Sequence, residues 1–175
     1  MLVYFIRHTS VDVPKGVCYG QTDVALRKTF PEEAADVKAR LEGVNFDKVF
    51  TSPLSRCRKL AAFCGYDDAE PDKRLLEMNF GEWEMQEYDK ITDPHIQVWY
   101  QDYYNVRATG GESFADQRDR LLSFINDLKM QPYKTVAVFA HGGILLQMML
   151  IKGIVTLDNA FASQPPYGGI ITVEI

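Results

Sequence analysis

Two short stretches of the chain are apolar throughout, with no alternation between apolar and polar positions. They cover residues 2–6 and 135–140, and each has the length of a strand. Uninterrupted apolar runs of this length are typical of strands that are buried on both faces of a parallel sheet. The pattern predicts further strands at residues 48–51 and at residues 170–175, the last of them after a pair of glycines.

The segments between these strands have the apolar spacing of helices that bury one face. We expect helices over about residues 30–41, 54–64, 114–129 and 144–151. Strands that alternate with helices favour a three-layer α/β fold, in which a mostly parallel central sheet carries helices on both faces. A chain of 175 residues with no repeat or linker fits one domain, residues 1–175.

Polar residues before three of these helices match known start signals. Thr29 and Glu32 have the spacing of a capping box. Ser52 is suited to the N-cap position, with Pro53 as the first helical residue. Ser113 is expected to cap the helix that begins at residue 114.

Composition excludes several classes of protein. The formal net charge of −5 argues against a general nucleic-acid binder, although a local group of arginines could still bind an anion. The chain has neither a signal-peptide pattern nor an apolar stretch of membrane-spanning length, so we expect no membrane association. Three cysteines give no disulfide framework and fit a reducing, cytoplasmic location.

Residues 78–111 have a different character from the rest of the chain. This segment is rich in tryptophan, tyrosine, aspartate and glutamine, and its helical periodicity is weak. One interpretation is an ordinary amphipathic helix whose aromatic side chains pack on the sheet layer. The other is a cap over the active site, which offers aromatic faces to a substrate that contains a ring.

Both long apolar strands lead directly into a histidine. His8 follows the first strand and is preceded by Arg7, and His141 follows the strand at residues 135–140. In open α/β sheets the ligand crevice lies outside the carboxyl ends of the strands. Arg56, in the first turn of the predicted second helix, is expected to point into the same crevice.

This set of side chains suits phosphoryl transfer, which demands positioning and charge stabilisation. Arginine forks match phosphate oxygens, and a neutral imidazole can form a covalent intermediate with phosphorus. The leaving oxygen then needs a proton from a general acid. Glu77, Glu82 and Glu84 are the candidates for that acid.

Four segments, in this order along the chain, resemble the motifs of the histidine phosphatase superfamily, the phosphoglycerate mutase-like clan. They are residues 7–8, 52–57, 76–84 and 141–142. The resemblance implies a phosphoglycerate mutase-like fold and a reaction without metal or organic cofactor. It implies these catalytic residues: His8 as nucleophile, Arg7, Arg56 and His141 as the phosphate pocket, and Glu77 as proton donor.

Residues 20–23, 83–85 and 110–114 resemble the α-ribazole phosphatase branch of this superfamily. That resemblance implies hydrolysis of α-ribazole 5′-phosphate during assembly of the cobalamin nucleotide loop. Thr9 departs from the family pattern, which has glycine at this position. The expected substrate-binding residues are Ser10, Gln21, Thr22, Gly142, Glu82 and Trp83.

Other functions stay open at this point. The chain could be a phosphoglycerate mutase or a broad-specificity phosphatase of the same superfamily, or an inactive phosphate-binding protein. A metallohydrolase built on His8 and His141 is disfavoured, because the sequence has no ligand spacing typical of such a site. The expected partner is a small-molecule phosphate ester, and the sequence leaves the oligomeric state open.

Overall fold

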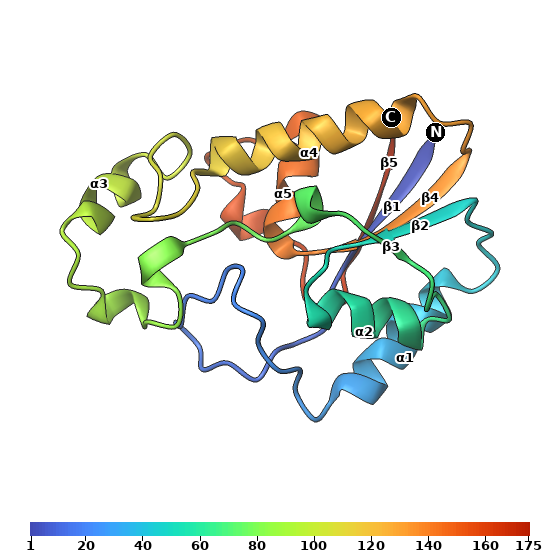
Figure 1. Ribbon diagram of the computed structural model, residues 1–175, viewed down its shortest axis with the longest axis horizontal. Helices are drawn as coiled ribbons and strands as arrows, with labels where there is room; N and C mark the ends of the chain where they lie inside the picture. The colour runs from blue at the N-terminus through green and yellow to red at the C-terminus, as the bar shows by residue number, and fades with distance from the viewer.

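The computed structural model describes residues 1–175 and contains one five-stranded sheet (Figure 1). The strand order is β3-β2-β4-β1-β5, and only β5 runs antiparallel to its neighbour. This arrangement confirms the predicted mostly parallel α/β fold. The strands are β1 (Leu2–Arg7), β2 (Lys48–Thr51), β3 (Glu70–Pro71), β4 (Thr135–Ala140) and β5 (Ile170–Glu174).

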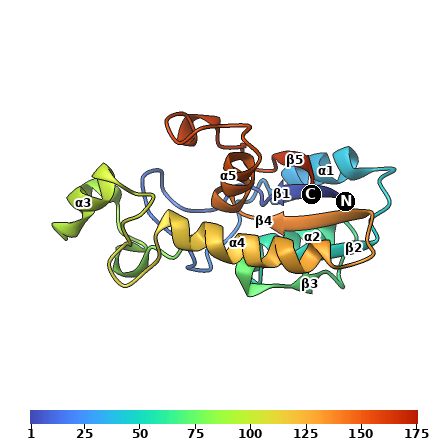
Figure 2. The same ribbon diagram turned by 90° about the horizontal axis from the view of Figure 1, so that it is seen from above.

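Helices cover both faces of this sheet, with α4 on one side and α1 and α2 on the other in Figure 1. Buried side chains of α1 and α2 pack on one face, and those of α4 and α5 pack on the other. The remaining helix, α3, lies at one end of the molecule, beyond the sheet (Figure 2). The helices are α1 (Phe30–Leu41), α2 (Ser55–Phe63), α3 (His95–Gln101), α4 (Phe114–Lys129) and α5 (Gly142–Ile151). Four short 3₁₀ turns lie at Lys73–Leu75, Gly81–Trp83, Tyr88–Lys90 and Phe161–Ser163.

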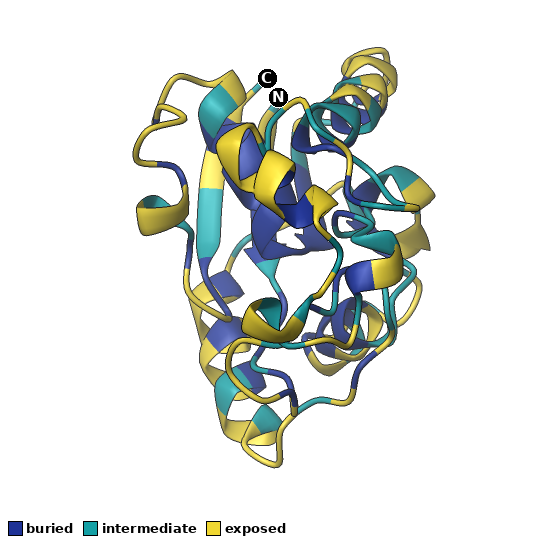
Figure 3. Ribbon diagram, turned by 90° about the vertical axis from the view of Figure 1, so that its left-hand side faces the viewer, coloured by how far each residue is buried: buried dark blue, intermediate teal, exposed yellow.

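The apolar runs in the sequence correspond to the centre of the sheet. β4 has β1 on one side and β2 on the other, and all its residues after Thr135 are buried. The middle of the molecule is accordingly coloured as buried in Figure 3. Because helices cover both faces, neither set of alternating side chains meets water, which is why these strands lack polar alternation. None of the helices combines the length and the apolarity needed to span a bilayer.

The predicted start signals have different outcomes. Ser113 caps α4 in a capping box with Asp116, as expected for a serine at this position. The capping box at Thr29 is wrong: its hydroxyl donates to Glu33, and it makes no cap hydrogen bond to the α1 backbone. The helix start at Pro53 is also wrong, since α2 begins at Ser55 with Leu54 at the N-cap.

Residues 78–111 form a lobe of short turns and α3, which is not the single helix of the first interpretation. The lobe has its own apolar cluster, in which Trp83 and Trp99 pack edge to face. Leu146 and Met149 of α5 belong to the same cluster, so the lobe is attached to the sheet domain through that helix. Other aromatic side chains of the lobe face a cavity described below.

Candidate active site

Three neighbouring parallel strands deliver side chains to one edge of the sheet. Arg7 at the end of β1 lies beside Ala140 at the end of β4, and Thr51 of β2 lies beside Phe139. The next residue after each strand therefore reaches the same place. These residues are His8, Ser52 and His141, and the rings of the two histidines lie 5.2 Å apart between centroids.

His8 is almost fully buried, and its ring is oriented by the backbone. Nδ1 lies 2.7 Å from the carbonyl oxygen of Thr9. A carbonyl can only accept, so Nδ1 carries the proton and Nε2 has a free lone pair. Burial, with the charges of Arg56 and Arg7, lowers the pKa of His8 well below its usual range, against a smaller opposite effect of the Thr9 hydrogen bond. His8 is therefore neutral at neutral pH, with Nε2 available for attack.

His141 is held by the residue that follows β2 and by a residue of α2. Its Nε2 lies 2.7 Å from the hydroxyl oxygen of Ser52, and 3.5 Å from Sγ of Cys57. Burial, followed by the charge of Arg56, lowers the pKa of His141 well below its usual range. Ser52 lies two residues before the N-cap Leu54, so its side chain binds this imidazole and does not cap α2.

Arg56 is completely buried beside both histidines. Its Nη1 donates to the carbonyl of Thr22 at 2.9 Å, and its Nη2 donates to that of Gly20 at 2.7 Å. Arg7 reaches the site from the other side, where its Nη1 donates to the carbonyl of Pro165 at 2.5 Å. The Nε of each arginine is buried and has no partner. Unpaired buried guanidinium donors of this kind are suited to binding an anion.

Glu77 faces the same site, and three N–H groups bind its carboxylate. Oε1 accepts from the backbone of Met78 and from Nε2 of Gln117, each at 2.9 Å, and Oε2 accepts from the backbone of Gly143 at 3.1 Å. Gly143 lies in the first turn of α5, where backbone N–H groups have no partner within the helix. The carboxylate is thus fixed beside the residue that follows His141-Gly142.

The two other acidic candidates lie elsewhere. Glu84 accepts hydrogen bonds from the backbone of Gln21, Thr22 and Phe80, so it holds the loop that presents carbonyls to Arg56. Glu82 is exposed. Of the three acidic side chains, only Glu77 lines the cavity beside the histidines.

A cavity of about 320 Å³ lies between Arg7, Glu77 and the lobe, and His8, Arg56 and His141 do not line it. Arg7 and Glu77 lie in its wall, and aromatic rings make up much of the remainder. Tyr167 covers Arg7 at 4.3 Å and lies against His8, and its hydroxyl is 3.0 Å from that of Tyr19. The aromatic lining residues are Tyr19, Phe80, Tyr88, Trp99, Tyr103, Phe114, Phe161 and Tyr167.

None of the six expected substrate-binding residues lines this cavity. Ser10 donates to the carboxylate of Glu33, at a distance of 2.8 Å from its backbone N–H. Trp83 is buried in the lobe, where its Nε1 donates to Asp93 at 2.8 Å. The backbone N–H groups of Gln21 and Thr22 donate to Glu84, and Glu82 is exposed. Gly142 lies next to Arg7, because a Cβ there would be 3.0 Å from the Arg7 Cζ.

Sequence reasoning missed Gln117, Gln164 and Tyr167 in the cavity wall. Tyr167 comes just before β5, and the sequence pattern does not show that this strand runs antiparallel to β1. An antiparallel strand beside β1 begins where β1 ends, so the residues before β5 reach the edge that carries His8. The pattern gave no signal for Gln117, a polar residue on the buried face of α4.

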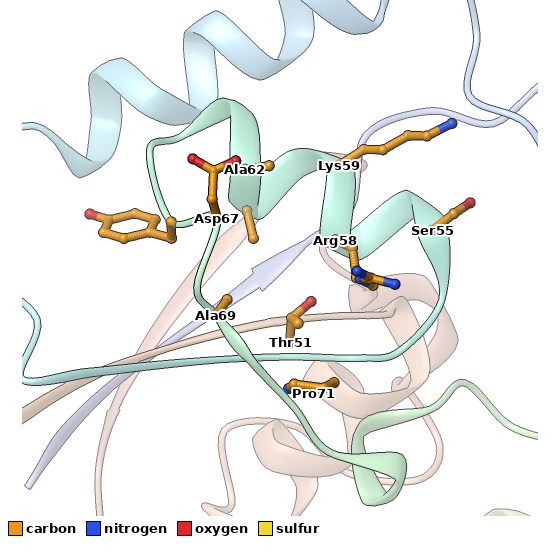
Figure 4. A pocket seen from close by; sticks show the side chains of 10 residues that line it. Thr51, Ser55, Arg58, Lys59, Ala62, Asp67, Ala69 and Pro71 are labelled. Atoms are coloured by element: carbon orange, nitrogen blue, oxygen red, sulfur yellow. The ribbon is translucent and has the colours of Figure 1, made fainter.

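A second hollow, of about 370 Å³, lies between α2 and the ends of β2 and β3 (Figure 4). Arg58 and Lys59 border it. It shares no lining residue with the cavity beside Glu77, so it is separate from the site described above. Nowhere in the chain do three histidine, cysteine or acidic side chains come together in a metal-binding arrangement.

Comparison with known proteins agrees with this geometry. The model of the histidine phosphatase superfamily (branch 1) matches residues 3–174, nearly the whole chain. The chain belongs to this superfamily. The adenosylcobalamin/alpha-ribazole phosphatase of Escherichia coli K12 is 29% identical over 154 residues, which cover 83% of this chain and 75% of that protein.

Two further relatives show the breadth of the superfamily. A 2,3-bisphosphoglycerate-dependent phosphoglycerate mutase of Mesorhizobium japonicum is 30% identical over 78% of this chain and 73% of its own length. The crystal structure of the alpha-ribazole phosphatase from Shigella flexneri superposes with a TM-score of 0.89 at 24% identity, covering all of this chain and 91% of that one. Its fold is the fold of this chain.

Proposed function

We propose that this protein is a phosphomonoesterase that acts through a phosphohistidine intermediate on His8. The observation that carries the proposal is the pairing of two buried, neutral imidazoles with two arginines whose Nε atoms have no partner. Such a site matches the charge and the shape of a phosphoryl group, and the N–H on Nδ1 leaves Nε2 of His8 as the nucleophile.

The reaction has two steps. Nε2 of His8 attacks phosphorus, the P–O bond to the alcohol breaks, and the alcohol oxygen takes a proton from the carboxyl of Glu77. Water then attacks the phosphohistidine, the P–N bond breaks with its electron pair returning to Nε2, and the Glu77 carboxylate takes a proton from the water. Arg7, Arg56 and His141 stabilise the equatorial oxygens in both transition states.

Trapping the intermediate tests the proposal. After rapid mixing with ³²P-labelled substrate and a quench in base, the wild-type protein should carry an acid-labile label. His8→Ala should carry none and should lose nearly all turnover, since Nε2 of the other imidazole in the site, that of His141, is engaged with Ser52. His95→Ala, at an exposed position, is the matched control and should be labelled like the wild type. Undiminished turnover in His8→Ala would reject the mechanism.

We further propose that the substrate is α-ribazole 5′-phosphate. This proposal is supported by the α-ribazole phosphatase among the relatives and by the aromatic cavity next to the phosphate site. Tyr103 and Phe161, whose ring centroids lie 4.8 Å apart, offer faces on which a flat base could stack. Stacking of a base on an aromatic side chain contributes about 1–3 kcal/mol. The expected preference in kcat/KM over an ester without a base is about tenfold to hundredfold.

A panel of phosphate esters decides the substrate. α-Ribazole 5′-phosphate should exceed 3-phosphoglycerate, sugar phosphates and phosphoserine, and Phe161→Ala should reduce that preference without slowing a small aryl phosphate. The identity with a phosphoglycerate mutase makes mutase activity the second candidate. Conversion of 3-phosphoglycerate in the presence of 2,3-bisphosphoglycerate, without release of phosphate, would favour it. Activity that survives a chelator would exclude a metallohydrolase.

A further inference from the structure

Gln117 is a polar side chain in a buried position, and one end of its amide is unpaired. It lies on α4, one turn after the Ser113 cap, and has no exposed surface. Nε2 donates to Oε1 of Glu77 at 2.9 Å, whereas Oε1 of Gln117 is buried without a partner. Buried acceptors without a partner are uncommon, and each calls for a physical explanation.

The surroundings fix this amide against Glu77. A Cβ on Gly143 would lie 2.2 Å from Oε1 of Glu77 and within 3.0 Å of both polar ends of Gln117. The glycine thus permits close contact among α4, α5 and the segment that carries Glu77. The capping box of α4 fixes the first turn of the helix, and with it the backbone position of Gln117.

We propose that Gln117 is a positioning residue whose amide matches both protonation states of Glu77. The inference rests on the proposed function, in which Glu77 donates a proton in the first step and accepts one in the second. An ionised carboxylate needs a donor, which Nε2 supplies. A protonated carboxyl needs an acceptor, and rotation of the amide by half a turn brings Oε1 to the same point. In each orientation one end of the Gln117 amide bonds Glu77 and the other end is unpaired. Rotation of the amide therefore keeps the number of hydrogen bonds constant.

Replacement of Gln117 by methionine tests this role, because methionine has similar length and neither donor nor acceptor ends. The rates of an alkyl phosphate and an activated aryl phosphate are compared. Gln117→Met should lower kcat/KM for the alkyl ester by about tenfold to hundredfold, since misplacement of a catalytic group by ~1 Å can cost about 10²-fold. The aryl ester needs little protonation of its leaving group, so its rate should change much less.

Gln147 provides a matched control on α5. It is equally buried, and its Nε2 donates to the Phe114 carbonyl while its Oε1 has no partner, but it does not contact Glu77. Gln147→Met should therefore leave the ratio of the alkyl to the aryl rate at the wild-type value. If Gln117→Met does not fold, Gln117→Asn replaces it. That variant keeps the amide but is one methylene too short, and the same change in the ratio is expected.

A pH series separates positioning from simple packing. In Gln117→Glu the new side chain is a like charge at neutral pH, and it becomes a donor and acceptor once protonated. Alkyl phosphatase activity of this variant should therefore rise, relative to the wild type, as the pH is lowered, whereas Gln117→Met should show no such recovery. If Gln117 only packs, relief of the buried charge should raise the alkyl and the aryl rates of Gln117→Glu alike, whereas positioning predicts a recovery that is selective for the alkyl ester.

The outcomes distinguish this inference from the proposed function. If Glu77→Gln slows both esters equally, Glu77 is not the proton donor, and that step of the proposed function fails. If Glu77→Gln slows the alkyl ester selectively but Gln117→Met does not, the proposed function stands and the role of Gln117 is overturned. A selective loss in Gln147→Met equal to that in Gln117→Met would also overturn it.

Discussion

Arg56 shows how a single charged side chain becomes part of the fold. A buried guanidinium is costly unless its donors are paired. Here two donors are paired with carbonyls of the 20–22 loop, and Nε is buried without a partner. Glu84 holds the same loop through the backbone N–H groups of Gln21 and Thr22, so the loop and the arginine depend on each other.

Arg56→Lys should therefore be a damaging substitution despite the retained charge. An ammonium is a point charge and cannot bond two carbonyls and a phosphate in one plane. We expect turnover to fall by about 10²–10³, the effect of losing one donor to the developing charge. The control is Arg58→Lys, two residues further along α2 at an exposed position, which should keep wild-type turnover. Turnover is measured by steady-state kinetics, and thermal unfolding checks that both variants fold. Near-normal kinetics in Arg56→Lys would show that Arg56 is not part of the phosphate pocket.

At the scale of elements, the start of α5 links His141 to Glu77. The helix begins at Gly142, directly after His141, and its second residue donates a backbone N–H to Glu77. A Cβ on Gly142 would lie 2.5 Å from Nε2 of Gln164, and one on Gly143 would lie 2.2 Å from Oε1 of Glu77, so either substitution would displace the end of a polar side chain.

Gly143→Ala separates helix stability from activity. Alanine favours a helix over glycine by up to about 1 kcal/mol, so the intrinsic stability of α5 should increase. The new Cβ would displace the carboxylate of Glu77, and hydrolysis of an alkyl phosphate should fall while the protein remains folded. The substitution should cause little further loss in a Glu77→Gln background, since both changes act on the same group. Additive losses in this double-mutant cycle would contradict the interpretation.

The whole molecule keeps two imidazoles neutral by burying them, and this couples stability to pH. The pKa values of His8 and His141 are lowered in the folded state, mainly by burial. Below about pH 6.5, the usual histidine pKa, the unfolded chain binds protons that the folded chain does not. The contribution of the two buried histidines to the free energy of unfolding is therefore present at neutral pH and is lost as the pH falls.

The free energy of unfolding should decrease between pH 7 and pH 5 with a slope that approaches about 1.4 kcal/mol per pH unit for each buried histidine. Denaturant titrations at several pH values measure it. His8→Gln and His141→Gln should each reduce the slope, and His95→Gln, at an exposed site, should leave it unchanged. A slope that both buried-site variants retain would show that other groups are responsible.

The sequence by itself determined the central sheet, most of the helices and the convergence of Arg7, His8, Arg56 and His141. These follow from local patterns: uninterrupted apolar runs define strands buried on both faces, and a residue that follows a parallel strand must lie at its carboxyl edge. The family resemblance then added Glu77, which the local pattern could not separate from Glu82 and Glu84.

Only the tertiary structure decided which polar groups pair across elements. Ser52 turned from an expected helix cap into the partner of His141, and Trp83 lies in the core of the lobe, away from the cavity. Tyr167 reaches His8 because β5 is antiparallel, a direction that its five residues do not encode. Contacts such as that of Gln117 with Glu77 join residues 40 positions apart, and packing geometry alone selects them. Local patterns report how a segment meets water, whereas the partner of a buried polar group depends on the whole fold.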